Sequence, residues 1–166
     1  MGEGGARVSK VGRNLGTRAC CQSRSVAGAE IWSQYPGTYR IDPAIAVKAF
    51  HRPAAGNEQP LPSDVRPPHI LVKTLDYLFH TLLPSQPLHL THPFLRDRTR
   101  SVRQDLTMQN ARGRLAIECN ERIARYHILA LGALREQVTF SESQELEQLR
   151  KGSFVLGSAH LQNLMI

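Results

Sequence analysis

The amino-acid sequence predicts an all-α fold: the first three to four helices of a stacked helical-repeat domain, preceded by a proline-rich N-terminal arm. Three observations support this prediction. All ten prolines lie at or before Pro93, and the apolar residues of the later part of the chain recur at the three-to-four-residue spacing of amphipathic helices. The predicted third helix is also apolar on two sides, which is typical of a helix packed between neighbours and favours a stacked array.

Two segments are predicted to precede the helices. Residues 1–33 are rich in glycine, serine and arginine and show no helical or strand period, so we expect a disordered basic segment. The same composition leaves a mitochondrial presequence as an alternative. Residues 34–68 are expected to form an extended arm, because five prolines lie between Arg52 and Pro68 and proline cannot donate a backbone hydrogen bond. Within the arm, Asp42-Pro43 can open a short helix that runs to about Phe50.

Two long helices and a connector are predicted next. The first helix begins at the Pro67-Pro68 pair, since proline is tolerated in the first helical turn, and ends before Pro84. A ten-residue connector from Pro84 to Pro93 holds three prolines. The second helix runs from about Pro93 to Gln109, with Asn110 as a left-handed stop. The expected apolar positions of these two helices are Leu71, Leu75, Leu78, Phe79, Leu82, Leu95, Val102 and Leu106.

The third helix is predicted over about Ala111 to Gln137. One apolar side consists of Cys119, Ile123, Tyr126, Ala130 and Leu134, and the other of Ile117, Ala124, Ile128 and Leu131. A fourth helix should start near Ser141 or Glu142, where Ser141 and Gln144 resemble a capping box. Gly152-Ser153 should weaken or end it. The helical domain is therefore expected over residues 69–151, with a separate tail over residues 152–166.

Positive charge is unevenly distributed: residues 1–30 carry a net charge of +3, and residues 92–114, which include the second helix, carry +4. The chain carries a formal net charge of +7 and an isoelectric point of about 9.8, which permits contact with nucleic acid or an acidic partner without requiring it. At 100° per residue, Arg96, Arg100 and Arg103 fall on one helix face and form a candidate partner or nucleic-acid face. Arg98 and Asp105 lie at the edge of the apolar stripe, where we expect them to brace helix packing. Solvated charge pairs on this helix are the alternative interpretation.

Residues that could carry chemistry are scarce. The sequence contains no phosphate-binding glycine loop, nucleophile elbow or C-x-x-C motif, so no catalytic, cofactor-binding or metal-binding residue is assigned, and no small-molecule substrate is expected. His89 and His92 are three residues apart, but the expected connector favours a solvated turn over a zinc site. His127 is interpreted as a hydrogen-bonded core residue. The cysteine count favours a reducing compartment, and no apolar run approaches a membrane span.

Several stretches of the sequence, in the same order, resemble one protein family. They are Pro36-Gly37-Thr38, the run from Val47 to Gly56, the run from Pro60 to Pro68 leading into Thr74-Leu75-Asp76-Tyr77-Leu78, the run from Asp97 to Asp105, and Arg125-Tyr126-His127. Together they are similar to the germinal-centre-associated nuclear protein (GANP) type of mRNA-export scaffold, known in fungi as suppressor-of-actin or leucine permease transcriptional regulator. The residues of these stretches are most similar to those of fungal members of the export branch.

The resemblance covers about Gln34 to Lys151 and carries specific implications. It implies a helical-repeat domain that continues into a winged helix, a companion winged-helix subunit and RNA as partners, and nuclear location at the pore in the intact protein. It implies a scaffold in transcription-coupled mRNA export and no enzymatic activity. The pattern does not continue after Lys151, so we expect a truncated copy in which the winged helix is missing. The alternative function is a nucleic-acid-binding module that acts through the arginine face.

Overall fold

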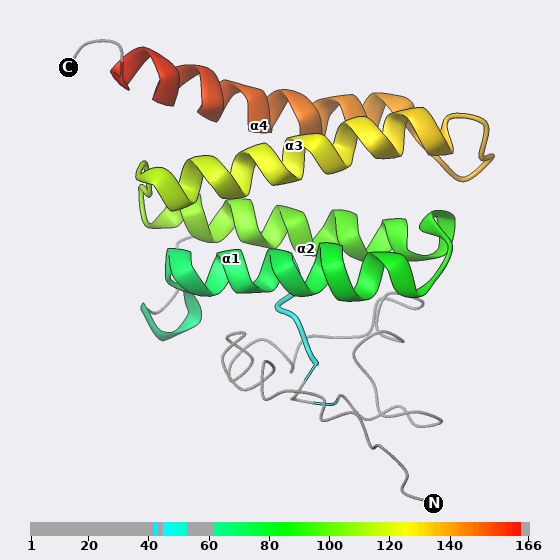
Figure 1. The fold of residues 1–166 in the computed structure, drawn as a ribbon, viewed down its shortest axis with the longest axis horizontal. Helices are drawn as coiled ribbons and strands as arrows, with labels where there is room; N and C mark the ends of the chain where they lie inside the picture. The colour runs from blue at the N-terminus through cyan, green and yellow to red at the C-terminus, as the bar shows by residue number, and fades with distance from the viewer. Residues whose placement is uncertain (1–41, 43–44, 53–61, 164–166) are drawn as a thin grey trace, which may run out of the picture.

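The computed structural model describes residue 42, residues 45–52 and residues 62–163, with side chains as far as Gly152. The expected basic segment 1–33 and parts of the expected extended arm (residues 34–41, 43–44 and 53–61) lie outside these residues. Every regular element in the described part of the chain is helical, which confirms the predicted all-α class. Figure 1 shows the four long helical segments stacked side by side with alternating directions, while the described arm residues lie against the first pair.

The first helical segment has three parts. The α-helix α1 spans Pro68–Asp76, the π-helical η4 spans Tyr77–Leu82, and the 3₁₀ turn η5 spans Leu83–Ser85. A short 3₁₀ turn, η3, precedes them at Pro62–Asp64. The predicted start at the proline pair is confirmed, because the carbonyl of Pro67 accepts from the amides of Ile70 and Leu71 at 2.9 and 3.2 Å. The segment was expected to end before Pro84, but its last turn is the 3₁₀ turn η5, which includes Pro84 and ends at Ser85.

The predicted connector from Pro84 to Pro93 is wrong, because the second helix, α2, spans Leu88–Met108 and contains Pro93. Its first turn closes on Pro87, whose carbonyl accepts from the amides of Leu90 and Thr91 at 3.0 and 3.3 Å. Proline has no amide hydrogen, so at Pro93 the carbonyl of His89 lacks the helical hydrogen bond that it would otherwise accept. Both residues are exposed, so water can supply that bond. The helix ends as expected, with Asn110 at a left-handed φ of 48°.

The third helix, α3, spans Arg114–Leu134 and contacts α1, α2 and α4. Its first predicted apolar side is confirmed, since Cys119, Ile123, Tyr126, Ala130 and Leu134 are all buried. The second side is covered only in part, because Ile128 is 59% exposed and Ile117 and Leu131 are half-buried. The core lies between α1, α2 and α3 and includes Leu71, Leu75, Leu78, Phe94, Leu95, Val102 and Ile123. This central position matches the sandwiched helix that two apolar sides predict.

The fourth helix, α4, spans Glu142–Asn163 and begins where it was predicted. The expected end at Gly152-Ser153 is wrong, because the helix passes through Gly152 and continues for eleven residues. A glycine weakens a helix without terminating it. Gly152 is buried beside α2, and a Cβ atom there would lie 4.0 Å from a terminal nitrogen of Arg103, an ordinary contact distance.

Replacing Gly152 with alanine should therefore stabilise the protein. Alanine is favoured over glycine in a helix interior by roughly 0.5–1 kcal/mol, and the structure leaves room for the extra methyl group. Urea unfolding of Gly152→Ala, followed by circular dichroism, measures the effect. Gly132→Ala is the matched control, because Gly132 lies in α3 with nothing within 4 Å of a Cβ. A loss of stability in Gly152→Ala alone would show that the α2–α4 contact does not tolerate a side chain here.

The short helix expected after Asp42 is also wrong. The Asp42 carbonyl accepts from the amides of Ile45 and Ala46 at 3.2 and 2.9 Å, which makes one turn. The following residues to Arg52 adopt no regular structure. Their polar groups bind α2 instead, while Ala46 and Val47 are 2% and 5% exposed. Tertiary contacts with α2 therefore replace the local hydrogen bonds that a helix would need.

Candidate functional site

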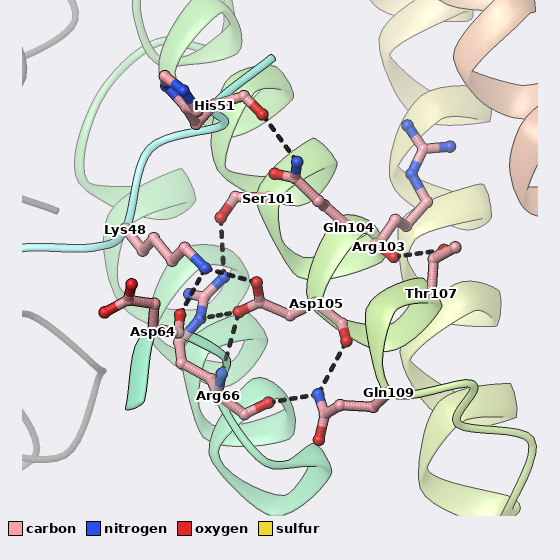
Figure 2. A network of polar contacts seen from close by, with 10 residues as sticks. All are labelled: Lys48, His51, Asp64, Arg66, Ser101, Arg103, Gln104, Asp105, Thr107 and Gln109. Atoms are coloured by element: carbon pink, nitrogen blue, oxygen red, sulfur yellow. Dashed lines mark hydrogen bonds and ion pairs between the residues drawn. The ribbon is translucent and has the colours of Figure 1, made fainter. Parts of the chain in front are cut away.

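One face of α2 holds the N-terminal arm through the carboxylate of Asp105. This side chain is fully buried, and the side chains of Lys48 and Arg66 are 10% and 2% exposed. Lys48 Nζ lies 2.6 Å from Oδ1 of Asp105, and Arg66 Nε lies 2.6 Å from Oδ2. The backbone amide of Arg66 also donates to Oδ2 at 3.3 Å. Figure 2 shows both basic side chains directed at this one carboxylate, which we call the Asp105 node.

Further hydrogen bonds attach the arm along α2. Ser101 Oγ accepts from Arg66 Nη2 at 2.9 Å, and Gln109 Nε2 donates to the Arg66 carbonyl at 2.7 Å (Figure 2). Gln104 Nε2 donates to the carbonyl of His51 at 2.7 Å. These side chains occur about one helical turn apart, so successive turns of α2 each present a polar group to the arm. The arm is therefore fixed along the helix rather than at one point.

The opposite contact of α2 is a buried polar cluster that holds α4, which we call the Glu145 cluster. Glu145 of α4 is 1% exposed, and its Oε1 lies 2.5 Å from Nδ1 of His127, which is itself fully buried. Its Oε2 lies 3.3 Å from Nε of Arg96 and 3.5 Å from Nε2 of His92. The hydroxyl of Tyr126 lies 2.7 Å from Nδ1 of His92. One carboxylate from α4 thus meets basic groups from both α2 and α3.

The predicted arginine face of Arg96, Arg100 and Arg103 is engaged within the molecule. Arg96 Nη2 donates to Oε1 of Gln144 at 2.9 Å, in addition to its contact with Glu145. The terminal nitrogens of Arg103 donate to the backbone carbonyl and the side-chain oxygen of Gln148. Burial and the charge of Arg100 lower the pKa of Arg103 to about 10, against the opposing effect of Glu145. The guanidinium carbon of Arg100 lies 3.9 Å from the ring centroid of Phe50 in the arm. Its use as a partner or nucleic-acid face stays a prediction.

The two predicted bracing residues do not meet each other. Arg98 and Asp105 are seven residues apart, about 10 Å along the axis of α2, and their recorded contacts are with other residues. Asp105 anchors the arm, whereas Arg98 donates to Asp97 and its guanidinium carbon lies 4.4 Å from the ring centroid of Phe94. Asp97 in turn accepts from the backbone amide of Phe50 at 3.1 Å. Each residue therefore contacts a different part of the structure.

Replacing Arg98 with alanine tests the bracing role. The side chain is 8% exposed and its partner Asp97 is 30% exposed, so the cost should lie between that of an exposed and a buried pair, at about 2 kcal/mol. The lost packing on Phe94 adds to the lost charge. Thermal melts of Arg98→Ala and Arg100→Ala make the comparison. A loss no larger than that of Arg100→Ala would contradict the bracing role.

The histidines lie where sequence patterns alone do not place them. His89 and His92 both belong to α2, but His89 is exposed while His92 is 8% exposed and stacks with Tyr126. The solvated turn expected for this pair is therefore wrong. The interpretation of His127 as a hydrogen-bonded core residue is confirmed by its contact with Glu145. Within residues 42, 45–52 and 62–163, no three histidine, cysteine or acidic side chains gather into a metal-binding group.

Protonation of the Glu145 cluster should lower stability at acidic pH. Burial, reinforced by the charges of Arg96 and His127 and opposed by Glu145, lowers the pKa of His92 below its ordinary value of 6.5. Burial acts to raise the pKa of Glu145, but the hydrogen bond and charge of His127, with the charges of His92 and Arg96, outweigh it and lower the pKa below 4.5. In both cases the unfolded chain binds protons more readily than the folded protein does. The contribution of each group to the free energy of unfolding is therefore lost as pH falls below that group's ordinary pKa.

We therefore expect the free energy of unfolding to fall on acidification in two stages, one starting below pH 6.5 and one below pH 4.5. Urea midpoints measured from pH 7.5 down to pH 3.5 detect both stages. His92→Gln should remove the first stage and leave the second. A midpoint that stays constant across this range, or a first stage unchanged in His92→Gln, would contradict the assignment.

Lys48, Arg66 and Glu145 were not predicted from the sequence as members of these sites. A signal was available for the Asp105 node, since an acidic residue flanked by the apolar Val102 and Leu106 needs a buried cation. Nothing in the arm's irregular sequence indicated which of its basic residues would supply that cation. Glu145 lies in the first turn of α4, where an acidic residue can complement the helix dipole while exposed, so the local sequence does not indicate its burial.

These contacts show an all-helical protein in which α2 binds the arm on one side and α4 on the other. Comparison with known proteins identifies the family to which the chain belongs. The model of the SAC3/GANP family matches residues 18–162. The chain is 60% identical over 124 residues to SAC3 family protein 1 of Schizosaccharomyces pombe, an alignment that covers 74% of the chain and 12% of that protein. It is 33% identical over 90 residues to Protein xmas of Drosophila melanogaster, covering 50% of the chain and 4% of that protein.

The chain belongs to the SAC3/GANP family. The match confirms the resemblance that the sequence motifs indicated, and it extends beyond residues 34–151 on both sides. The chain spans about an eighth of the fission yeast relative and a smaller part of the fly relative. None of the helices within the described residues is long and apolar enough to cross a lipid bilayer.

Proposed function

We propose that this chain is a protein-interaction segment of a nuclear scaffold for transcription-coupled mRNA export. The observation that carries the proposal is membership of the SAC3/GANP family, with the family model matching residues 18–162. The chain acts without catalysis, as a folded part of a longer assembly. Its intact protein works in the nucleus at the pore, with a companion winged-helix subunit and RNA as partners.

The internal contacts support a scaffold role over the alternative of an RNA-binding arginine face. Arg96 and Arg103 bind side chains of α4, and Arg100 stacks on the arm. A nucleic acid that used these three residues would have to displace contacts on both sides of α2. A scaffold uses the same contacts to keep its helices in a fixed arrangement, which other surfaces can then present to a protein partner.

A segment exchange in fission yeast tests the proposal. The 124 matched residues of SAC3 family protein 1 are replaced by the corresponding residues of this chain, and the distribution of polyadenylated RNA is measured by in situ hybridisation. We expect the exchange to preserve export and deletion of the segment to retain the RNA in the nucleus. Preserved export after deletion would contradict the proposal.

A salt titration separates the two functions. Binding of a fluorescent RNA to the purified chain should be weak, and Arg96→Gln, Arg100→Gln and Arg103→Gln should change it little. Tight RNA binding that falls steeply with salt and is lost in these variants would favour the arginine face instead.

A further inference from the structure

The connection between α2 and α3 carries an exposed arginine-glycine pair. Arg112-Gly113 is the only Arg-Gly dipeptide in the sequence, and Arg112, Gly113 and Arg114 are all exposed. The pair lies between the end of α2 at Met108 and the start of α3 at Arg114. Neither the arm nor the Glu145 cluster uses it in any contact that the structure records.

The turn geometry fixes Arg112 by its inner nitrogen and leaves its outer nitrogens available. Asn110 has a left-handed φ of 48°, and its Oδ1 accepts from Nε of Arg112 at 3.1 Å. This bond holds the guanidinium at Nε, while Nη1 and Nη2 have no partner among the described residues. Arg103, Arg122 and Arg125 differ, because their terminal nitrogens are bound to Gln148, Asp76 and Glu121.

Gly113 keeps the approach to Arg112 open. A Cβ atom built on Gly113 would meet nothing within 4 Å, and its backbone is extended, with φ −71° and ψ 176°. An extended, exposed residue without a side chain lets a second protein come close to the backbone beside the arginine. The turn therefore presents a guanidinium whose reactive nitrogens and flanking backbone are both accessible.

We propose that Arg112 is a site of arginine methylation. The lone pair of Nη1 or Nη2 attacks the methyl carbon of a sulfonium donor such as S-adenosylmethionine. The new N–C bond forms as the S–C bond breaks, its electron pair stays on sulfur as a neutral thioether, and the guanidinium proton is lost to solvent. Methylation keeps the positive charge but removes hydrogen-bond donors, so it alters what this turn can bind without unfolding it. The Nε bond to Asn110 is unaffected.

The test uses the full 166-residue chain, an arginine methyltransferase selective for Arg-Gly sequences and a labelled methyl donor. We expect one or two methyl groups on Arg112, located by tandem mass spectrometry of the peptide that contains it. Arg112→Lys should abolish incorporation. Gly113→Ala should strongly reduce it, although the arginine remains and the structure has room for the methyl side chain.

Arg135→Lys is the matched control. Arg135 is also exposed, and its recorded contact with Glu142 is likewise through Nε, at 4.0 Å, but Glu136 follows it instead of glycine. This variant should be methylated like the unchanged chain. Circular dichroism of each variant shows that the fold is kept. Methylation that is absent from the folded chain, that maps to other arginines, or that is unchanged in Arg112→Lys would overturn the proposal.

Discussion

Replacing Asp105 with asparagine should destabilise the protein by about 3–5 kcal/mol, because it removes the buried carboxylate charge that Lys48 and Arg66 share. Such a loss is a large share of the roughly 5–15 kcal/mol that stabilises a typical domain. Asparagine preserves the shape of the side chain, so the effect reports the charge and not a cavity. Urea unfolding followed by circular dichroism provides the measurement.

An exposed pair supplies the comparison for Asp105→Asn. Glu121 and Arg125 form an ion pair in which the side chains are 50% and 69% exposed, so Glu121→Gln should cost under about 1 kcal/mol. Apolar replacement of both cations, Lys48→Met with Arg66→Met, should recover part of the loss in the Asp105→Asn background. An Asp105→Asn variant as stable as Glu121→Gln would show that the Asp105 node does not hold the arm in place.

Replacing Glu145 with glutamine should cost about 3 kcal/mol and loosen α4 before the rest of the fold. The carboxylate is 1% exposed and is the common partner of His127, His92 and Arg96, so its loss leaves several basic groups poorly paired. Hydrogen exchange read by mass spectrometry should show faster exchange in α4 than in α1. This order is expected because, in the part of α4 whose side chains the structure describes, the buried side chains are the polar Glu145 and Gln148.

Glu147→Gln is the control on the same helix. Glu147 lies two residues further along α4, is exposed, and pairs with Lys151 at the surface. This variant should leave both the unfolding midpoint and the exchange of α4 nearly unchanged. Equal effects of Glu145→Gln and Glu147→Gln would show that the Glu145 cluster does not hold α4.

The helices built on local patterns could be predicted from the sequence. Leu71, Leu75 and Leu78 recur at helical spacing and are fully buried, as are Cys119 and Ile123 of α3. The stop at Asn110 was predictable because a short polar side chain tolerates a left-handed conformation. These features depend on neighbours within one or two helical turns, and the sequence contains that information directly.

The predictions that were wrong concern helices whose ends depend on contacts between residues far apart in the sequence. Pro93 and Gly152 are strong local signals for a boundary, yet both lie inside helices whose packing outweighs the local cost. Asp42 opens only one turn because the following arm residues bind α2. The arm's attachment could not be predicted, since Lys48 and Asp105 are 57 positions apart and no periodic pattern links them.

The separation between Lys48 and Asp105 also has a kinetic consequence. Closing a loop of 57 residues costs more chain entropy than pairing adjacent helices, so we expect the helices to associate before the arm does. Interactions that form after the rate-limiting step mainly slow unfolding and leave the folding rate almost unchanged. The arm would then set how long the folded molecule lasts rather than how quickly it forms. The Asp105 node would act as the closing contact that determines the lifetime of the native state.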